Sequence, residues 1–250
     1  MHVRRKLIVG NWKMNGSVAQ LRQLQGIGDA SQKAAGLDVA ICPPFTLMSA
    51  AVTRSGGRLI IGAQDCHSAD SGAHTGSVSA PMIKEAGGRM AIVGHSERRA
   101  DPGESDIVVR AKAEAALRHR LAVIVCVGEN QLDRAAGDQW PVVERQLAGS
   151  LPDEWEEGEL VVAYEPVWAI GTGNVATAAD VTEMHAAIRA ALVDRFGDLG
   201  GRIRILYGGS VNADNAAELF GCREVDGALV GGASLTAAQF VPIIEAAAAS

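Results

Sequence analysis

The chain has 250 residues, of which 48% are hydrophobic and 21% are charged, and its formal net charge at pH 7 is −6. This mildly acidic balance argues against a nucleic-acid or membrane surface as the main partner, so an anionic ligand must be bound by local geometry. The apolar stretch after the basic N-terminus is too short for a signal peptide or a membrane span. Because no low-complexity linker or charge block divides the chain, we expect one domain over residues 1–250.

The cysteine, histidine and glycine patterns restrict the cofactors. No C-x-x-C pair occurs among the four cysteines, which are Cys42, Cys66, Cys126 and Cys222, and this scatter fits a reduced protein of the cytoplasm. The histidines outside position 95 show no metal-ligand spacing. The chain has neither Gly-x-x-x-x-Gly-Lys-Ser/Thr nor Gly-x-Gly-x-x-Gly opening a helix. We therefore expect no metal and no nucleotide cofactor.

Short apolar runs alternate with helix-like stretches along the whole chain. The runs predict strands at Leu7–Val9, Val39–Ile41, Leu59–Ile61, Met90–Val93, Ala122–Val127, Leu160–Ala163, Ile203–Leu206 and Ala228–Val230. Helices are expected in stretches such as Val18–Ala35, Ile107–Arg120, Ala178–Phe196 and Ala237–Ala249. This alternation predicts βαβ units and a parallel sheet, and the continuous apolar strands indicate that both faces of the sheet are covered.

The polar residues that follow these strands separate an open sheet from a closed one. Such clusters come after the first, fourth, sixth, seventh and eighth runs, at Asn11-Trp12-Lys13, His95 to Arg99, Glu165, Gly208-Gly209-Ser210 and Gly231-Gly232. With strands about 4.8 Å apart, the first and last clusters of an open, sequentially ordered sheet would lie more than about 30 Å from each other. Closure into a barrel brings all five to one mouth, at the C-terminal face where barrel enzymes hold their active sites.

Glu165 is a candidate catalytic base. It follows a buried strand that ends at Pro166, because proline has no N–H to donate to the ladder. An apolar loop then ends in Gly171-Thr172-Gly173, a composition that fits a hinged lid. A carboxylate at a strand end beside a lid suggests a base that works with water excluded.

The last two clusters favour a phosphate ligand. Gly208-Gly209-Ser210 and Gly231-Gly232 follow the last two strands, where barrel folds often bind phosphate. Glycine allows the backbone to approach an anion closely, and successive N–H groups form an anion-binding concavity. Each glycine pair alone would be read as a tight turn, but together, beside Ser210 and the lid residue Gly171, they favour phosphate.

Five motifs, in order and at the expected spacing, resemble the triosephosphate isomerase family. They are Gly10 to Asn15, Gly94 to Arg99, Tyr164 to Gly173, Tyr207 to Ser210 and Leu229 to Ser234. The resemblance implies an α/β chain folded as a closed eight-stranded parallel (β/α)8 TIM barrel. It implies the interconversion of dihydroxyacetone phosphate and D-glyceraldehyde 3-phosphate through an enediolate. It also implies Glu165 as base and neutral His95 as electrophile, a pair for which this enzyme is itself the standard illustration.

The remaining site residues are expected around a lysine. By resemblance, Lys13 stabilises the charge of the enediolate and phosphate, and Asn11 helps to orient it. Glu97 is close enough in sequence to His95 to reach this cation in the mouth. A helical turn opening after His95 would direct N–H groups at the imidazole and keep it uncharged.

A long loop, Gln64 to Gly76, predicts a homodimer. It exceeds a typical βα connection and resembles the loop that this family inserts into its partner subunit. We expect Thr75 to reach Asn11 and Lys13 of the neighbouring subunit. Several positions depart from the usual family pattern, namely Asp65, Ser77, Ala100-Asp101-Pro102 and the lid residue Asn174. These departures concern lid motion and the strength of the subunit contact, and none is in the catalytic set.

Two other functions remain open at this stage. An isomerase of a four-carbon ketose phosphate would need the same base, electrophile and phosphate site, and the motifs do not measure the length of the pocket. A non-catalytic phosphometabolite-binding barrel is disfavoured, because it predicts degraded catalytic positions whereas Lys13, His95 and Glu165 are all present.

Overall fold

The computed structural model describes residues 4–155, 158–169 and 176–250. Eight parallel strands pair in sequence order, and the last pairs with the first, so the sheet is a closed barrel. The strands are β1 (Lys6–Asn11), β2 (Leu37–Cys42), β3 (Ile60–Ala63), β4 (Met90–Val93), β5 (Ala122–Val127), β6 (Glu159–Tyr164), β7 (Arg204–Tyr207) and β8 (Gly227–Val230). The predicted (β/α)8 barrel is confirmed, with each strand within two residues of its predicted bounds.

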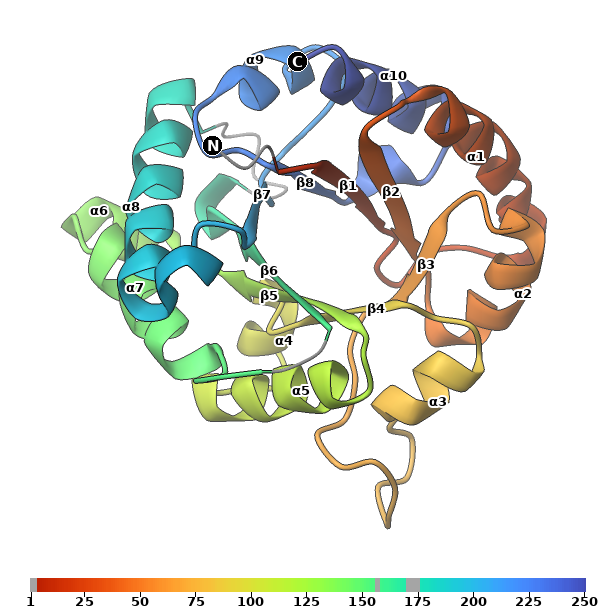
Figure 1. The fold of residues 1–250 in the computed structure, drawn as a ribbon, viewed down its shortest axis with the longest axis horizontal. Coiled ribbons are helices and arrows are strands. Elements are labelled where there is room, and N and C mark those ends of the chain that lie inside the picture. The colour runs from red at the N-terminus through yellow and green to blue at the C-terminus, as the bar shows by residue number, and fades with distance from the viewer. Residues whose placement is uncertain (1–3, 156–157, 170–175) are drawn as a thin grey trace.

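Helices surround the barrel on its outside (Figure 1). They are α1 (Gln23–Lys33), α2 (Phe45–Ser55), α3 (Ala80–Glu85), α4 (Ser96–Ala100), α5 (Asp106–Arg118), α6 (Gln131–Ala136), α7 (Gln139–Ser150), α8 (Ala178–Phe196), α9 (Ala216–Gly221) and α10 (Ala237–Ala248). The helix predicted over Val18–Ala35 is instead divided. Its start is a 3₁₀ helix, η1 (Val18–Arg22), which opens with a backbone bond from the Gln20 N–H to the Ser17 carbonyl, three residues back, at 3.0 Å.

The core has two layers, which explains why the strands read as continuous apolar runs. Alternate strand residues point inward and fill the barrel, among them Val9, Ile92, Ile124 and Leu206. Their neighbours point outward and pack beneath the helices. Both sets are removed from water, so neither face of a strand needs polar side chains.

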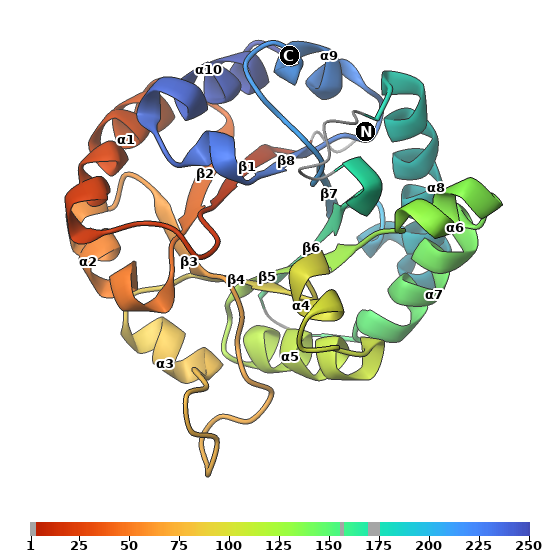
Figure 2. The ribbon, with the colours of Figure 1, turned by 180° about the vertical axis from the view of Figure 1, so that it is seen from behind.

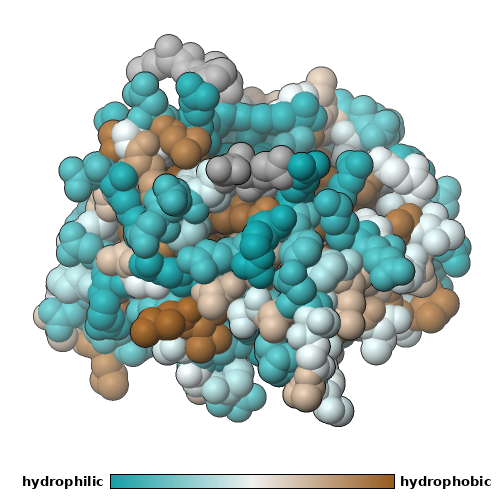
Figure 3. All heavy atoms as spheres, turned by 60° about the horizontal axis from the view of Figure 1, so that its bottom comes forward, coloured by the Kyte–Doolittle hydropathy of each residue, from teal (hydrophilic) through white to brown (hydrophobic). Residues whose placement is uncertain are grey.

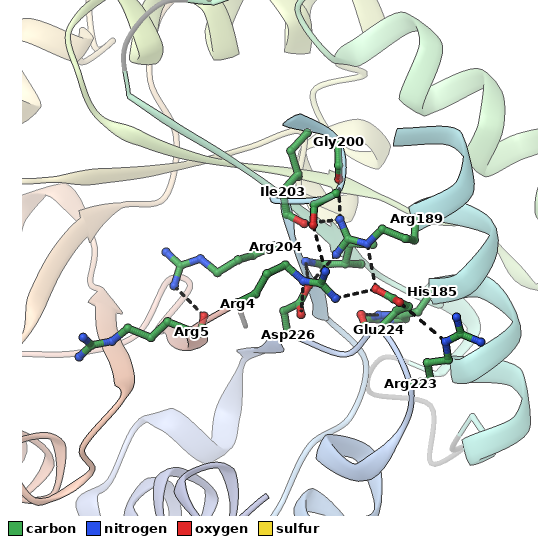
Figure 4. Close-up of polar contacts among 12 residues, drawn as sticks. Arg4, Arg5, His185, Arg189, Gly200, Ile203, Arg204, Arg223, Glu224 and Asp226 are labelled. Atoms are coloured by element: carbon green, nitrogen blue, oxygen red, sulfur yellow. Dashed lines mark hydrogen bonds and ion pairs between the residues drawn. The ribbon is translucent and has the colours of Figure 1, made fainter. Parts of the chain in front are cut away.

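The N-terminal end of the barrel is closed by charged side chains (Figure 4). Arg4, which precedes β1, bonds the carboxylates of Glu224 and Asp226 at 2.6 and 2.7 Å. Arg189 of α8 bonds the same two carboxylates at 2.9 and 2.8 Å, and its remaining donors reach the carbonyls of Gly200 and Ile203. This cluster, Arg4–Arg189–Glu224–Asp226, ties the start of the chain to the segment before β8.

The segment between β3 and α3 leaves the barrel and projects from it, as the views from both sides show (Figures 1 and 2). It contains the loop Gln64 to Gly76. Within it the rings of His67 and His74 are in contact, with centroids 4.0 Å apart and planes tilted by 31°. Figure 3 turns the molecule so that the lower edge of Figure 1 comes forward. The surface seen there is mostly hydrophilic, with separate hydrophobic patches. Among the helices described here, none is long and apolar enough to cross a membrane.

Candidate active site

A cavity of about 200 Å³ lies where the C-terminal ends of the strands meet. Its lining contains Asn11, Lys13, His95, Glu165, Gly208, Gly209, Ser210, Val211, Leu229, Gly231, Gly232 and Ala233. The structure thus brings together seven of the predicted site residues, contributed by the ends of five different strands. Glu97 joins them through Lys13, and Gly171 lies outside the described residues.

Glu165 is buried at the end of β6, with 2% of its surface exposed. Its backbone is fixed because its N–H donates to the Val127 carbonyl of β5. The carboxylate accepts from the Ser96 N–H at 3.0 Å, and its other oxygen lies 3.0 Å from His95 Nε2. It also lies against Cys126, where burial and this carboxylate raise the pKa of the thiol well above its ordinary value. The thiol therefore remains protonated beside the carboxylate.

His95 lies two residues after β4 and caps the short helix α4, so a helical turn opens after it as the sequence predicted. Its Nδ1 accepts the Glu97 backbone N–H at 3.2 Å. An accepting Nδ1 carries no proton, so in the neutral ring the proton is on Nε2, the atom that faces Glu165. The imidazole thus presents an N–H donor to the cavity without carrying a full charge.

Lys13 follows β1 in a left-handed backbone conformation, with φ of 53°. Its ammonium is 2.6 Å from the Glu97 carboxylate, which confirms the predicted proximity of these two side chains. Its backbone N–H donates to the Asn11 side chain at 3.0 Å. The carbonyl of Lys13 accepts from the side-chain amide of Gln64, which comes from the loop after β3.

The glycines opposite Lys13 are required by close packing. A Cβ on Gly209 would lie 2.2 Å from the Tyr207 hydroxyl, and one on Gly208 would lie 2.8 Å from Glu165 Cγ. Ser210 donates its hydroxyl to the Ala169 carbonyl at 2.8 Å, which joins the loop after β7 to the residues that precede 170–175. Residues 170–175 lie outside the described residues, and the predicted lid, including Asn174, falls largely on them.

Several neighbours of the site were not predicted from the sequence. Ser96 supports the Glu165 carboxylate, although its place directly after His95 was a usable signal. Glu129 is fully buried after β5 and accepts from the Tyr164 hydroxyl and the Trp168 indole at 3.0 and 2.8 Å. Burial raises the pKa of this carboxyl despite both bonds. Glu129 therefore anchors η2 (Val167–Ala169), the first part of the loop predicted to form the lid.

A second cavity, of about 470 Å³, opens beside Lys13 on the side of the projecting loop. Its lining contains Asn11, Lys13, Met14, Phe45, Gln64, Asp65, His95, Glu97, Arg98, Asp101 and Pro102. Asp65 is held there by Lys112 at 2.7 Å and Arg98 at 3.0 Å. Glu104 also pairs with both of these cations, each at 2.6 Å. The departure at Asp65 is thus accommodated by a four-residue ion cluster.

A closed parallel barrel with a carboxylate, an imidazole and an ammonium at its C-terminal mouth is typical of enzymes that move protons on small anionic substrates. The comparisons define the family more narrowly. The sequence model of the triosephosphate isomerase family matches residues 6–247. The chain belongs to this family, whose members are aldose–ketose isomerases of glycolysis.

Individual relatives match over their full lengths. Triosephosphate isomerase of Ruegeria sp. (strain TM1040) is 56% identical over 248 residues, which cover 98% of this chain and 99% of that protein. The enzyme of Rhodopseudomonas palustris (strain BisA53) is 56% identical over 243 residues, or 96% of each chain. The crystal structure of triosephosphate isomerase from Bartonella henselae superposes with a TM-score of 0.90 at 46% identity, covering 97% of this chain and 98% of that one.

Proposed function

We propose that the residues at the mouth perform the isomerisation of dihydroxyacetone phosphate and D-glyceraldehyde 3-phosphate in the following roles. The observation that carries the proposal is the pair formed by Glu165 and His95, whose Oε1 and Nε2 atoms are 3.0 Å apart while Nδ1 accepts a backbone N–H. This geometry places a carboxylate, which can accept a proton, beside an imidazole nitrogen that can donate a hydrogen bond. A substrate with neighbouring carbonyl and hydroxyl carbons would replace their mutual contact.

Glu165 takes the proton from the carbon next to the carbonyl; the electron pair of that C–H bond forms a C=C bond, and the π pair of the carbonyl moves onto its oxygen to give an enediolate. His95 donates its Nε2 proton to the oxygen where negative charge develops and takes a proton from the neighbouring oxygen. Glu165 then returns its proton to the other carbon. No atom is gained or lost, so the reaction requires neither an oxidant nor a further reactant.

Lys13 supplies the positive charge for the enediolate and the phosphate, and Glu97 and Asn11 hold it. The phosphate would be bound by backbone N–H groups of Ser210, Gly231 and Gly232, which line the cavity opposite the base. Gly171 is proposed to contribute from the lid when it closes. The cavity is therefore divided into a reacting end at Glu165 and His95 and an anchoring end at the glycines.

A coupled assay of the purified protein with each triose phosphate, in EDTA and without nucleotide, tests this function. We expect turnover in both directions that EDTA does not reduce. Absence of turnover with either triose phosphate, or loss of activity after EDTA treatment, would overturn the proposal. A four-carbon ketose phosphate is assayed as a further substrate. Faster turnover of this sugar than of the triose phosphates would favour the alternative that the protein is its isomerase.

We also propose a homodimer built through the loop Gln64 to Gly76, with Thr75 directed at Asn11 and Lys13 of the second copy. The loop projects from the barrel. In the proposed dimer, the loop of one copy enters the second cavity, beside Lys13, of the other copy. Met14 and Phe45, which line that cavity, are 96% and 37% exposed, so the cavity offers apolar surface that a second copy could cover. Sedimentation and kcat of the wild type and of Thr75→Arg test this arrangement, and a fully active monomer would contradict it.

Two further proposals concern the chain as a whole. We propose that residues 1–250 form a single domain, since β1 and β8 from opposite ends of the chain pair in one barrel. We propose that the enzyme acts in the cytoplasm, where its family takes part in glycolysis and gluconeogenesis. Four free cysteines are consistent with that reducing compartment. Burial raises the pKa of the Cys42 and Cys66 thiols to about 12.

A further inference from the structure

The backbone of Lys13 is in a conformation that lysine does not favour. Its φ of 53° lies in the left-handed region, where the Cβ of an L-residue crowds the following carbonyl. Strained backbone of this kind persists only when the surroundings impose it, and it concentrates at functional sites. At Lys13 this conformation sets the direction in which the side chain leaves β1. The ammonium then comes 2.6 Å from Glu97.

Three side-chain amides hold the two peptide groups that flank Lys13. Asn11 accepts from the Lys13 N–H at 3.0 Å, and Asn15 donates to the Trp12 carbonyl at 3.0 Å. Gln64 donates to the Lys13 carbonyl at 2.9 Å and, through the same nitrogen, to the Cys42 carbonyl at 2.8 Å. Gln64 is therefore the amide that connects Lys13 to the end of β2, a part of the rigid barrel.

Gln64 does not line the cavity that contains Glu165 and His95. It is half-buried in the second cavity, where it opens the projecting loop. Its amide reaches two carbonyls on different strand ends, and Cys42 also accepts the Trp12 N–H at 3.1 Å. Rotation of the Lys13 peptide out of the left-handed region would break the bond from Gln64. The amide thus opposes relaxation of the strained residue.

We propose that Gln64 is a positioning residue, which keeps Lys13 in its left-handed conformation and so fixes the ammonium at the mouth. The inference rests on the proposed role of Lys13 in the isomerisation. Two hydrogen bonds of the net strength usual in proteins correspond to a factor of about ten to a hundred in a population. Loss of both should reduce by that factor the share of molecules with Lys13 correctly placed.

The experiment compares Gln64→Met with Gln23→Met, each alone and with Lys13→Met. Methionine keeps the length of glutamine and removes its hydrogen bonds. Gln23 is a matched control because it is also half-buried and its side chain also bonds the backbone, accepting from Ala237 N–H at 2.9 Å, and it lines neither cavity. The readouts are kcat/KM for both triose phosphates, the inhibition constant of inorganic phosphate, and the midpoint of thermal unfolding. Sedimentation establishes that each variant has the oligomeric state of the wild type.

We expect Gln64→Met to lower kcat/KM about tenfold to a hundredfold and to weaken phosphate inhibition, while Gln23→Met changes neither. In the Lys13→Met background Gln64→Met should have no further effect on kcat/KM, because the group it positions is absent. An equal loss in both backgrounds, or no loss in either, would overturn the inference. If Gln64→Met does not purify as folded protein, the isosteric Gln64→Glu, which also lacks the donors, must show the same pattern.

The design separates this inference from the proposed function. If Lys13→Met alone retains full activity, the proposed role of Lys13 fails, and with it the inference. If Lys13→Met loses activity and Gln64→Met in the wild-type background does not, the role of Lys13 stands and the positioning by Gln64 is overturned.

Discussion

Both ends of the barrel contain buried ionisable side chains, but their surroundings differ. At the N-terminal end, Arg4 and Arg189 share the carboxylates of Glu224 and Asp226, and the remaining donors of Arg189 reach backbone carbonyls. At the mouth, the proposed base Glu165 is held by the Ser96 N–H and lies 3.0 Å from His95 Nε2, next to an open cavity. At the N-terminal end the charged side chains are paired with one another. At the mouth Glu165 and His95 border a cavity that a substrate can enter.

The comparison teaches that position in a barrel does not by itself decide what a charged residue does. The Arg189 side chain is 10% exposed, and each of its three nitrogens already donates to a carboxylate or a carbonyl. His95 is similarly buried but directs its one proton at the cavity. We therefore expect changes at the mouth to affect activity and changes at the N-terminal end to affect stability.

The largest effect should follow Glu165→Gln, which keeps the shape of the side chain and removes the proton acceptor. We expect kcat to fall by at least ~10²-fold, the lower end for general base catalysis, because Glu165 is the one carboxylate among the described residues that line the cavity at the mouth. KM should change far less, since phosphate binding is assigned to other residues. Steady-state kinetics measure both constants, and retained kcat would show that Glu165 is not the base.

The next largest effect should follow Arg189→Met at the other end. Removing one partner of a buried ion cluster leaves Arg4 as the one close cationic partner that the structure describes for Glu224 and Asp226, so we expect the free energy of unfolding to fall by about 3 to 5 kcal/mol. The kcat of the folded enzyme should stay near that of the wild type. Denaturant unfolding and kinetics on the same sample measure the two quantities.

Arg223→Met is the matched control for that change. Arg223 lies 3.8 Å from the same Glu224, but its side chain is 83% exposed. An exposed pair of this kind contributes little, so we expect a change within about 1 kcal/mol. Equal losses in the two variants would indicate that burial of the cluster is not what stabilises this end.

A smaller effect concerns His185 on α8, which is fully buried and bonds the Glu224 carbonyl through Nδ1 at 3.0 Å. Burial lowers the pKa of this imidazole to about 4. Below about pH 6.5 the unfolded chain gains a proton there and the folded chain does not. Stability is therefore lost as pH falls from about 6.5 toward 4, by up to about 3 kcal/mol in total.

His185→Asn keeps a donor for the Glu224 carbonyl and removes the titration. We expect its unfolding free energy to fall less steeply between pH 6.5 and 4 than that of the wild type. Urea unfolding across this range measures the slope. Identical slopes in the two proteins would show that His185 does not cause the acid sensitivity.

The smallest effect is expected at Asp65. Burial is the main cause that raises the pKa of this carboxyl, against the opposing charges of Lys112 and Arg98. A raised pKa in the folded state means that stability falls as pH rises past the ordinary aspartate value near 4. Asp65→Asn should remove this pH dependence and change stability at pH 7 by about 1 kcal/mol or less, since Glu104 still pairs Lys112. A loss of several kcal/mol would mean that Asp65 is a required partner of Lys112.

Much of the fold and of the site could be predicted from the sequence, because each depends on local pattern. The strands are apolar runs, and closure followed from polar residues such as Asn11 and Glu165 at the strand ends. The support for those residues could not be predicted. Gln64 acts on Lys13 through a carbonyl, which leaves no mark on the side-chain pattern. The partners Arg4 and Asp226 are 222 positions apart and meet only when the barrel closes.

The most direct test of the central claim is the isomerisation in deuterium oxide, followed by NMR of the product. If Glu165 removes a carbon-bound proton at the mouth, part of the product must carry deuterium at the carbon that receives the proton. The rate of incorporation should fall with kcat in Glu165→Gln. Turnover that leaves no deuterium at either carbon would contradict proton transfer through an enediolate, and with it the role assigned to this end of the barrel.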